Sequence, residues 1–328
     1  MENQTLLIEQ INRSQEKIQA IKQEIGKVIV GQTQLIEFLL MAILADGHII
    51  LEGVPGVAKT LAANTLANIL ACDFKRVQFT PDLLPADLIG TSIYNTKEGS
   101  FFVKKGPIFT QFLLADEINR APAKVQSALL EVMQEKQVTI GGETFKIAPP
   151  FLVLATQNPV EQEGTYPLAE AQTDRFMMKI KVDYPSRKEE KQILSRMGTM
   201  KSIPQVQKIM SIEDIFAFRK IVDAVYMDEK IVDYILDIIL STRTPEIYKI
   251  NILGLLDYGA SPRASLAIKM ASKACAFLNG RHFVTPQDIK TVCYPVLRHR
   301  LKLSYEAEAE NLSADAIIAR ILDTLPMP

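Results

Sequence analysis

Apolar residues in the first part of the chain form short continuous runs separated by stretches with helical spacing. The runs of strand length are 48–52, 75–79, 112–116, 151–156 and 177–181. Helical spacing occurs at 59–71 and 122–135, and two further helices precede the first run, at 3–27 and up to about residue 45. Buried strands that alternate with helices predict an α/β fold with a parallel sheet and helices on both faces.

Two insertions interrupt this alternation. Residues 81–107 predict an exposed hairpin carried by a short helix, with Phe101 and Phe102 beside a glycine turn. Large apolar side chains on an exposed loop are typical of a contact surface. Residues 137–147 predict a second hairpin, because two strand-like runs flank Gly141-Gly142 and such a pair suits a two-residue turn.

From residue 186 onward only helical patterns remain. Helices are expected at about 186–197, 211–225, 229–241, 262–279 and 286–299. Ser211 and Thr285 are placed to cap two of them, since acids follow in the first turn. At 328 residues the chain exceeds the usual size of one core. We therefore predict an α/β core over 1–185, which includes both insertions, and a small all-helical lid domain over 186–328.

A glycine-rich segment joins the first strand to the next helix. It reads Gly53-Val54-Pro55-Gly56-Val57-Ala58-Lys59-Thr60, followed by Leu61. In such a phosphate-binding loop, backbone N–H groups surround a polyphosphate, the lysine bridges the β- and γ-phosphates and the threonine hydroxyl binds Mg²⁺. Ala58 stands where glycine is usual, and because alanine disfavours positive φ we expect it to be helical already. A glycine-rich turn that binds nothing is the alternative.

Polar residues at the ends of two later strands decide against that alternative. Asp116 and Glu117 end the run at 112–116, and Asn158 follows the run at 151–156. The carboxyl ends of parallel strands share the edge of the sheet where ligands bind. We expect Asp116 to hold Mg²⁺ through water, Glu117 to deprotonate the attacking water and Asn158 to position it. The pattern predicts hydrolysis of a nucleotide with Mg²⁺.

With these motifs in place, the chain resembles the MoxR family of AAA+ ATPases, in the helix-2-insert clade. The matching stretches are 52–60, 80–90, 114–122, 155–159, 164–168, 170–176 and 259–263. Ala169 and Thr173 depart from the family pattern without touching the chemistry. The resemblance implies the P-loop NTPase fold, with a three-layer αβα core and a helical lid. It also implies a homo-oligomeric ring, expected to be a hexamer, with both inserted hairpins facing its pore.

The resemblance also assigns roles to residues outside the strand ends. Gly31 and Gln32 would lie beside the adenine base. Arg175 matches the arginine finger that reaches the nucleotide of a neighbouring subunit, and Arg263, at the start of a lid helix, would swing onto the γ-phosphate. Arg120 follows the acid pair closely, and either an interface contact or a structural salt bridge would suit it.

Composition narrows the possible partners and location. The formal net charge is −1, so we expect no polybasic surface and no strong nucleic-acid binding. Cys72, Cys275 and Cys293 are scattered through apolar segments, which is typical of reduced core thiols. The N-terminus has no apolar signal core and no run reaches membrane-spanning length, so a cytoplasmic protein is expected.

The leading functional prediction is a chaperone-like ATPase that remodels or matures a partner protein complex. The resemblance alone implies that this partner carries a von Willebrand A domain. The alternatives are a nucleic-acid motor, a metal-chelatase motor subunit, and a scaffold that binds ATP only to oligomerise. Near-neutral charge and the absence of an appended DNA-binding module disfavour the nucleic-acid motor. The presence of Glu117 and Arg175 disfavours the scaffold.

Overall fold

The centre of the molecule is a parallel five-stranded sheet in the order β2-β5-β8-β1-β9. The computed structural model describes residues 2–159, 164–198 and 204–328. The strands are β1 (Ile49–Glu52), β2 (Phe74–Gln78), β5 (Phe112–Asp116), β8 (Leu152–Gln157) and β9 (Met178–Lys181). Each coincides closely with a predicted strand. β5 and β8 are buried along almost their whole length, as the inner strands of a parallel sheet must be.

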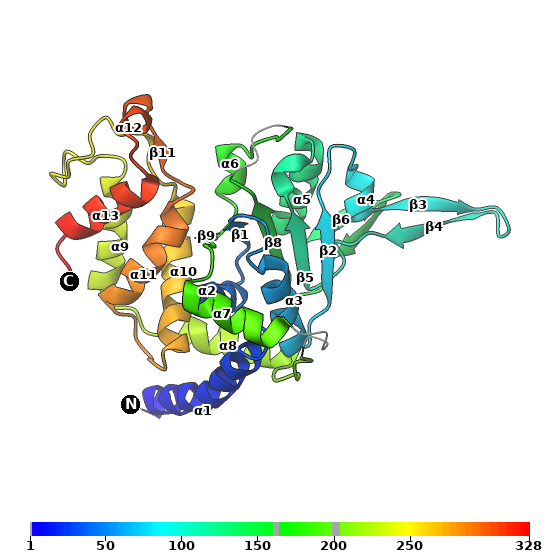
Figure 1. The fold of residues 1–328 in the computed structure, drawn as a ribbon, viewed down its shortest axis with the longest axis horizontal. Coiled ribbons are helices and arrows are strands. Elements are labelled where there is room, and N and C mark those ends of the chain that lie inside the picture. The colour runs from blue at the N-terminus through cyan, green and yellow to red at the C-terminus, as the bar shows by residue number, and fades with distance from the viewer. Residues whose placement is uncertain (1, 160–163, 199–203) are drawn as a thin grey trace.

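Helices cover both faces of this sheet (Figure 1). Along β5, Phe112 and Leu114 join the apolar core shared with α1 (Glu2–Ile25), α2 (Thr33–Leu44) and α3 (Lys59–Ile69). Leu113 and Ala115 join the second core, which contains α5 (Ala123–Glu135). Successive strand side chains point to opposite faces, so a continuous apolar run fills both cores. The predicted three-layer αβα core is confirmed.

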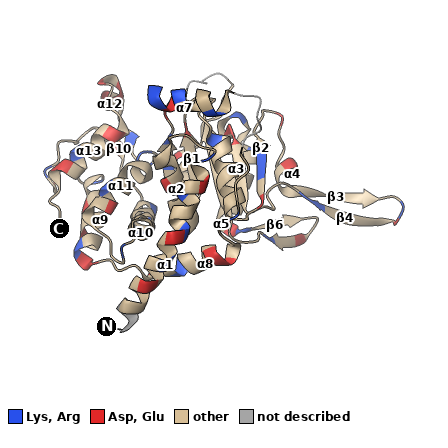
Figure 2. Ribbon diagram, turned by 60° about the horizontal axis from the view of Figure 1, so that its bottom comes forward, with Lys and Arg blue, Asp and Glu red and all other residues tan. Residues whose placement is uncertain are grey.

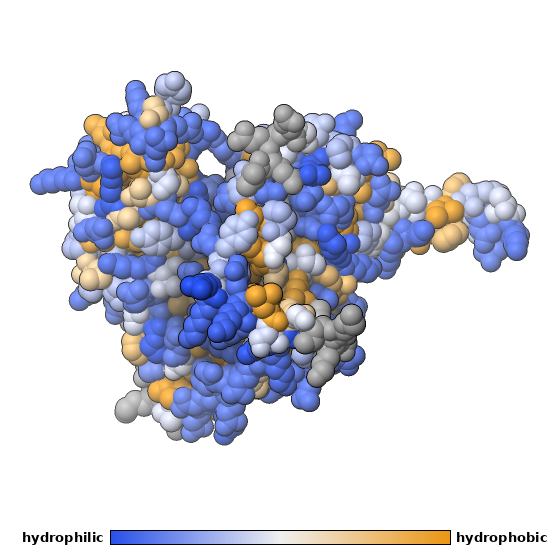
Figure 3. All heavy atoms as spheres, in the orientation of Figure 1, coloured by the Kyte–Doolittle hydropathy of each residue, from blue (hydrophilic) through white to orange (hydrophobic). Residues whose placement is uncertain are grey.

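Both inserted hairpins are present. After α4 (Pro85–Ile89), β3 (Gly90–Asn95) and β4 (Ser100–Lys105) form a hairpin that projects far from the body of the molecule (Figure 1). It carries an apolar patch that is visible on its surface (Figure 3), with Phe101 71% and Phe102 49% exposed. The second hairpin, β6 (Gln137–Ile140) with β7 (Glu143–Lys146), turns at two glycines that both have positive φ, as a tight two-residue turn requires.

The region after residue 186 consists mainly of helices. They are α7 (Arg187–Met197), α8 (Ile212–Ala224), α9 (Glu229–Ser241), α10 (Pro262–Leu278), α11 (Pro286–Leu297), α12 (Tyr305–Ala309) and α13 (Ala314–Thr324), while the four-residue α6 (Glu170–Thr173) precedes β9. The expectation of an all-helical region needs one correction, because β10 (Leu256–Tyr258) and β11 (Lys302–Leu303) pair as a two-stranded ribbon. Strands this short are too brief to show a period-two pattern in the sequence.

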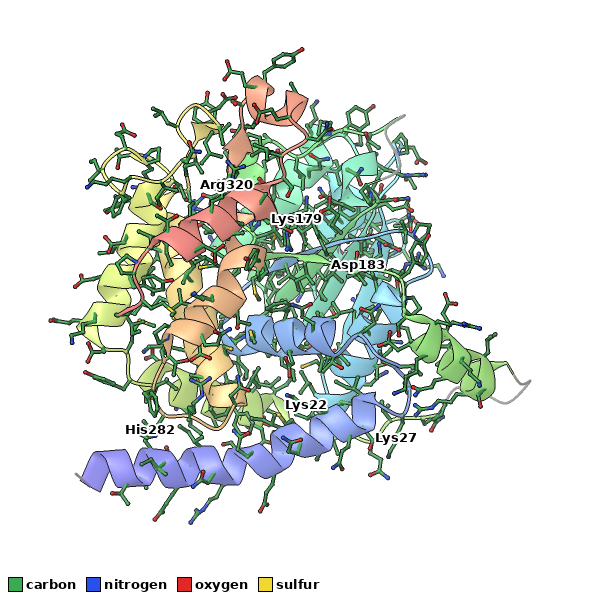
Figure 4. All side chains as sticks on the ribbon, turned by 60° about the vertical axis from the view of Figure 1, so that its left-hand side comes forward. Lys22, Lys27, Lys179, Asp183, His282 and Arg320 are labelled. Atoms are coloured by element: carbon green, nitrogen blue, oxygen red, sulfur yellow. The ribbon has the colours of Figure 1, made fainter. Side chains whose placement is uncertain are left out.

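The apolar core continues from the N-terminal helices into this helical region. Residues of α1, α2, α8 and α10 belong to one buried cluster. Figure 4 shows α1 running along one side of the molecule, beneath α2 and α10. The three cysteines are buried, and burial raises the pKa of Cys72 and of Cys275 to about 12. The burial of all three confirms the prediction that they are core residues. No helix in the described ranges is long and apolar enough to cross a membrane.

A buried ion pair stabilises the start of α11. Arg281 Nη2 lies 2.5 Å from Asp288 Oδ1, and the Asp288 side chain is 3% exposed. Burial alone would raise the pKa of Asp288, but hydrogen bonds from Arg281 and Thr285 outweigh it, so the pKa is lowered. Thr285 also caps the helix, as the sequence predicts, and Ser211 caps α8 in the same way.

Replacing Arg281 with glutamine should lower the free energy of unfolding by about 3 kcal/mol, because Asp288 would stay buried without its charged partner. The lowered pKa of Asp288 means that its contribution is present above an unfolded pKa of about 3.9 and is lost as pH falls through the folded value. Urea unfolding of both proteins should therefore show the difference at neutral pH and a smaller one below about pH 4. Arg13→Gln, on the exposed side of α1, is the control. Equal stability of Arg281→Gln and wild type would contradict the prediction.

Candidate active site

A cavity of about 560 Å³ opens at the carboxyl ends of β1, β5 and β8. The glycine-rich loop, both strand-end acids and the strand-end amide line it together. The lining residues with polar or loop character are Pro55, Gly56, Ala58, Lys59, Thr60, Arg76, Asp116, Glu117, Thr156 and Asn158. The structure therefore brings together the groups that sequence analysis placed at this sheet edge, as the topology of a parallel sheet requires.

The loop itself differs from expectation at one residue. Ala58 has φ 61° and ψ 21°, a left-handed conformation, and α3 begins only at Lys59. The prediction that Ala58 is helical is wrong. The chain has to reverse its direction at the end of the loop before the helix can start, and a left-handed residue achieves this at a cost of roughly 1–2 kcal/mol for a side chain other than glycine. Surrounding contacts, not local preference, set this conformation.

The predicted loop residues divide into two groups. The cavity is lined by Pro55, Gly56 and Ala58, and by the stretch 59–61, which ends at Leu61. Gly53 and Val57 are buried beneath it, and Val54 packs against the core. A Cβ on Gly53 would come within 2.4 Å of the Val182 carbonyl oxygen, so no other residue fits there. The Lys59 ammonium donates to the Gly53 carbonyl and is thereby held across the loop.

One threonine organises both acids. Thr156 Oγ1 donates to Asp116 Oδ1 at 2.6 Å and accepts from the backbone N–H of Glu117 at 2.8 Å. Arg76 lies on the other side of Asp116, with Nη2 2.6 Å from Oδ2. Glu117 accepts a hydrogen bond from Gln78 Nε2 at 2.7 Å and pairs with Arg120 Nε at 3.1 Å. Arg120 thus forms the salt bridge that was one of its two predicted roles.

Sequence analysis did not identify Arg76, Gln78 or Thr156 as site residues. Arg76 and Gln78 alternate along β2, and their contacts arise because β2 pairs with β5 in a register that sets Gln78 opposite Asp116. Their spacing of two is a weak signal of a shared face. Only the order of strands in the sheet shows that this face borders the acids.

The cavity fits a divalent cation that is shared with a phosphate. The Thr60 hydroxyl and the Asp116 carboxylate face the same space, and Mg²⁺ prefers such oxygen ligands together with substrate phosphates. The described residues hold no cluster of three or more His, Cys, Asp or Glu that could bind a metal without such help. Arg76 neutralises Asp116 here, and a bound cation would take over that role.

The other residues that line this cavity are apolar. Val28, Ile29 and Val30 line it, together with Ile193 and Met197 of α7. The predicted base-contacting residues lie just beyond: Gly31 lines an adjoining hollow of about 240 Å³, and Gln32 Nε2 donates to the Asp183 carbonyl at 3.0 Å. The structure therefore places the three residues before Gly31, rather than Gly31 and Gln32 themselves, against the main cavity. A helix from the region after residue 186 also borders it.

Arg175 and Arg263 lie elsewhere. Both line a separate surface cavity of about 350 Å³, where Arg263 Nη1 is 3.5 Å from Asp174 Oδ2. Arg263 lies at the start of α10, beside the segment that precedes β9, and does not line the main cavity. Its predicted movement onto the γ-phosphate stays a prediction. Arg175 is exposed, and its side chain forms no hydrogen bond or ion pair with the described part of the chain.

Two family models match the chain. Residues 48–178 match the ATPase family associated with various cellular activities (AAA), and residues 254–321 match the AAA lid domain. The chain is also 51% identical over 306 residues to the chaperone MoxR1 of Mycobacterium tuberculosis, which covers 93% of this chain and 81% of that protein. The chain belongs to the MoxR family of AAA+ ATPases.

Other relatives agree with this MoxR assignment. YeaC of Bacillus subtilis is 44% identical over 93% of both chains, and MoxR of Paracoccus denitrificans is 32% identical over 92% of this chain and 93% of that one. A crystal structure of a candidate ATPase from Cytophaga hutchinsonii superposes with a TM-score of 0.93 at 52% identity, over 100% of this chain and 99% of that chain. The AAA+ fold with its lid is confirmed, and the MoxR-family chain is an ATPase that binds nucleotide with a divalent metal.

Proposed function

We propose that this MoxR-family protein hydrolyses ATP to ADP and phosphate in a homo-oligomeric ring and uses the reaction to remodel or mature a partner protein complex. The observation that carries the proposal is the convergence of the loop, the acid pair and Asn158 on one cavity, with two arginines exposed on another surface. The division into a core over 1–185 and a lid over 186–328 is part of the proposal.

The loop and the acid pair would bind the substrate. The polyphosphate of ATP would lie against the backbone N–H groups of the loop, at the positive N-terminus of α3. Lys59 would leave the Gly53 carbonyl and contact the β- and γ-phosphates. Thr60 and Asp116 would hold Mg²⁺, which neutralises charge on the phosphates when bound.

Glu117 would act as the general base. Its carboxylate would accept a proton from the attacking water as the water oxygen bonds to the γ-phosphorus and the bond to the β-phosphate oxygen breaks. Asn158 would orient that water. Gln78 and Arg120 both contact Glu117 Oε2, so they limit where the base can point.

The two exposed arginines would complete the site of a neighbouring subunit. Arg175 and Arg263 share a cavity that is separate from the nucleotide cavity of their own chain. Cationic side chains on an outer surface can contact the phosphates of a second copy, where they would stabilise the charge that develops during transfer. We infer that a ring, expected to be a hexamer, is the active form.

The projecting hairpin would contact the client. Phe101 and Phe102 lie on β4, and Tyr94 faces Phe101 with ring centroids 5.0 Å apart. An exposed aromatic cluster on a protruding arm suits contact with another protein. MoxR1 of M. tuberculosis is called a chaperone, which supports a remodelling role here. We propose a client with a von Willebrand A domain, on the sequence resemblance. Figure 2 shows basic and acidic residues interspersed, with no single basic face in that view.

The specific ATPase activity of the wild type should rise with protein concentration. Dilution would separate the subunits and remove Arg175 and Arg263 from each neighbouring site, so turnover per chain would fall. Steady-state phosphate release over a concentration series, with light scattering to follow assembly, makes the measurement. A specific activity that does not change while the assembly dissociates would show a self-contained monomeric hydrolase and refute the ring.

A further inference from the structure

Arg300, just after α11, is a buried arginine with an unusual set of acceptors. Its side chain is 2% exposed, and Nε donates to Asp174 Oδ1 at 2.8 Å. Nη2 donates to the backbone carbonyls of Asp174 at 3.0 Å and Phe176 at 2.6 Å, and Nη1 donates to that of Met177 at 3.0 Å. A buried guanidinium is costly unless its donors are satisfied. Nη1 also donates to the Val296 carbonyl on α11, and the other contacts are directed at one short segment.

That segment carries Arg175. The three carbonyls lie on both sides of it, in the stretch between α6 and β9, and the Phe176 carbonyl also lies 3.0 Å from His299 Nε2. Buried carbonyl groups need hydrogen-bond partners, and a single side chain from the helical region supplies three of them. The backbone N–H groups of 174–176 bond back into α6, and that of Met177 donates to the His48 carbonyl at 2.7 Å. Arg300 therefore holds the carbonyl groups of this segment.

Asp174 ties the same segment to a second helix. The Ser261 hydroxyl contacts both Asp174 carboxylate oxygens, at 3.1 and 2.9 Å, and Ser261 is the N-cap of α10. Arg263, two residues later, is 3.5 Å from the same carboxylate. Asp174, the residue before Arg175, is thus bound both to Arg300 and to the start of α10, where Arg263 lies.

Arg298 makes similar contacts, but not with the segment that contains Arg175. Its Nη1 donates to the Lys179 carbonyl on β9 at 2.9 Å, and its Nε lies 2.7 Å from Asp315 Oδ1 on α13. α11 packs against β9, the strand that carries Lys179. Arg298 is, like Arg300, a largely buried lid arginine that pairs with an aspartate and binds a backbone carbonyl. It is therefore a matched control.

We propose that Arg300 is a positioning residue for Arg175. Arg300 attaches the backbone segment that contains Arg175 to α11, and Asp174 attaches the same segment to α10. The helical region therefore sets the direction in which Arg175 points toward a neighbouring subunit. The inference rests on the proposed function, because it assumes that Arg175 acts in a ring. It implies that Arg175 and Arg263 move together with the lid when the lid moves.

The first test compares Arg300→Gln with Arg298→Gln. Each removes one guanidinium, and similar decreases in melting temperature are expected. Arg300→Gln should lower turnover by about 10²-fold at unchanged ATP affinity and ring size, because misplacing a reacting group by about 1 Å has that effect. Arg298→Gln should keep turnover close to wild type. Equal turnover losses in the two variants, or full activity of Arg300→Gln, would overturn the inference.

The second test mixes subunits. Arg300→Gln keeps its own nucleotide site, whereas Glu117→Gln keeps its arginines. Each variant alone should therefore turn over slowly, and mixed rings should regain activity. Replacing the Glu117→Gln partner with the double variant Glu117→Gln/Arg175→Ala should abolish the recovery. A loss of activity that comes only from unfolding would not be restored in this pattern, and absence of recovery would reject the inference.

A third variant guards against failure to fold. Arg300→Lys keeps the charge and most of the volume, but a single ammonium cannot reproduce the guanidinium fork. It should give an intermediate loss of turnover, and its mixture with Glu117→Gln should recover activity in the same way. Wild-type turnover that is independent of assembly would refute the ring itself, whereas assembly-dependent turnover with fully active Arg300→Gln and Arg300→Lys would refute only the role of Arg300.

Discussion

Replacing Arg175 with alanine is expected to lower ATP turnover by at least about 10³-fold in protein that still binds nucleotide and still forms its ring. The guanidinium is exposed and has no partner within the described residues, so its removal leaves no buried charge and costs little stability. Its cavity is separate from the nucleotide cavity of its own chain, so ATP affinity of the isolated subunit should not change.

The measurement is steady-state phosphate release at a concentration where the assembly is complete, with nucleotide binding measured separately. Arg13→Ala, an exposed arginine on α1, is the matched control and should behave as wild type. Mixing Arg175→Ala with Glu117→Gln should restore part of the activity, because each chain supplies what the other lacks. Wild-type turnover by Arg175→Ala in assembled protein would remove this arginine from the mechanism.

Replacing Glu117 with glutamine should lower turnover by about 10²–10⁴-fold, because an amide cannot accept the proton from the attacking water. The substitution keeps the size and shape of the side chain. The glutamine oxygen can still accept the hydrogen bond from Gln78, although the ion pair with Arg120 is lost. The phosphate loop and Asp116 are untouched, so nucleotide binding should be retained.

Single-turnover hydrolysis and direct titration with a fluorescent ATP analogue separate these two effects. The control is Glu131→Gln, an exposed glutamate on α5 outside the cavity, which should hydrolyse ATP normally. Loss of binding together with turnover would mean that Glu117 supports the site structurally. Unimpaired hydrolysis would show that another group is the base and would remove the present assignment.

The sequence by itself determined the fold class and most of the nucleotide cavity. The apolar runs, the glycine-rich loop and the acids at 116 and 117 are local patterns, and each is read from residues that are neighbours in the chain. In a parallel sheet the carboxyl ends of all strands lie at one edge, whatever the order of the strands. Asn158 could therefore be placed beside Asp116 from the sequence. The tight turn at Gly141-Gly142 is local in the same way.

Only the tertiary structure decided the features that depend on distant contacts. Arg76 and Gln78 reach the acids because β2 and β5 are neighbours, and strand order leaves no trace in a local pattern. Ala58 adopts a conformation against its own preference, because surrounding structure outweighs a cost of roughly 1–2 kcal/mol. Asp174 and Ser261 meet across 87 positions of sequence, and that contact sets where Arg263 lies. Such pairs form when helices pack on the assembled sheet, and their energies are shared among many residues instead of being carried by one motif.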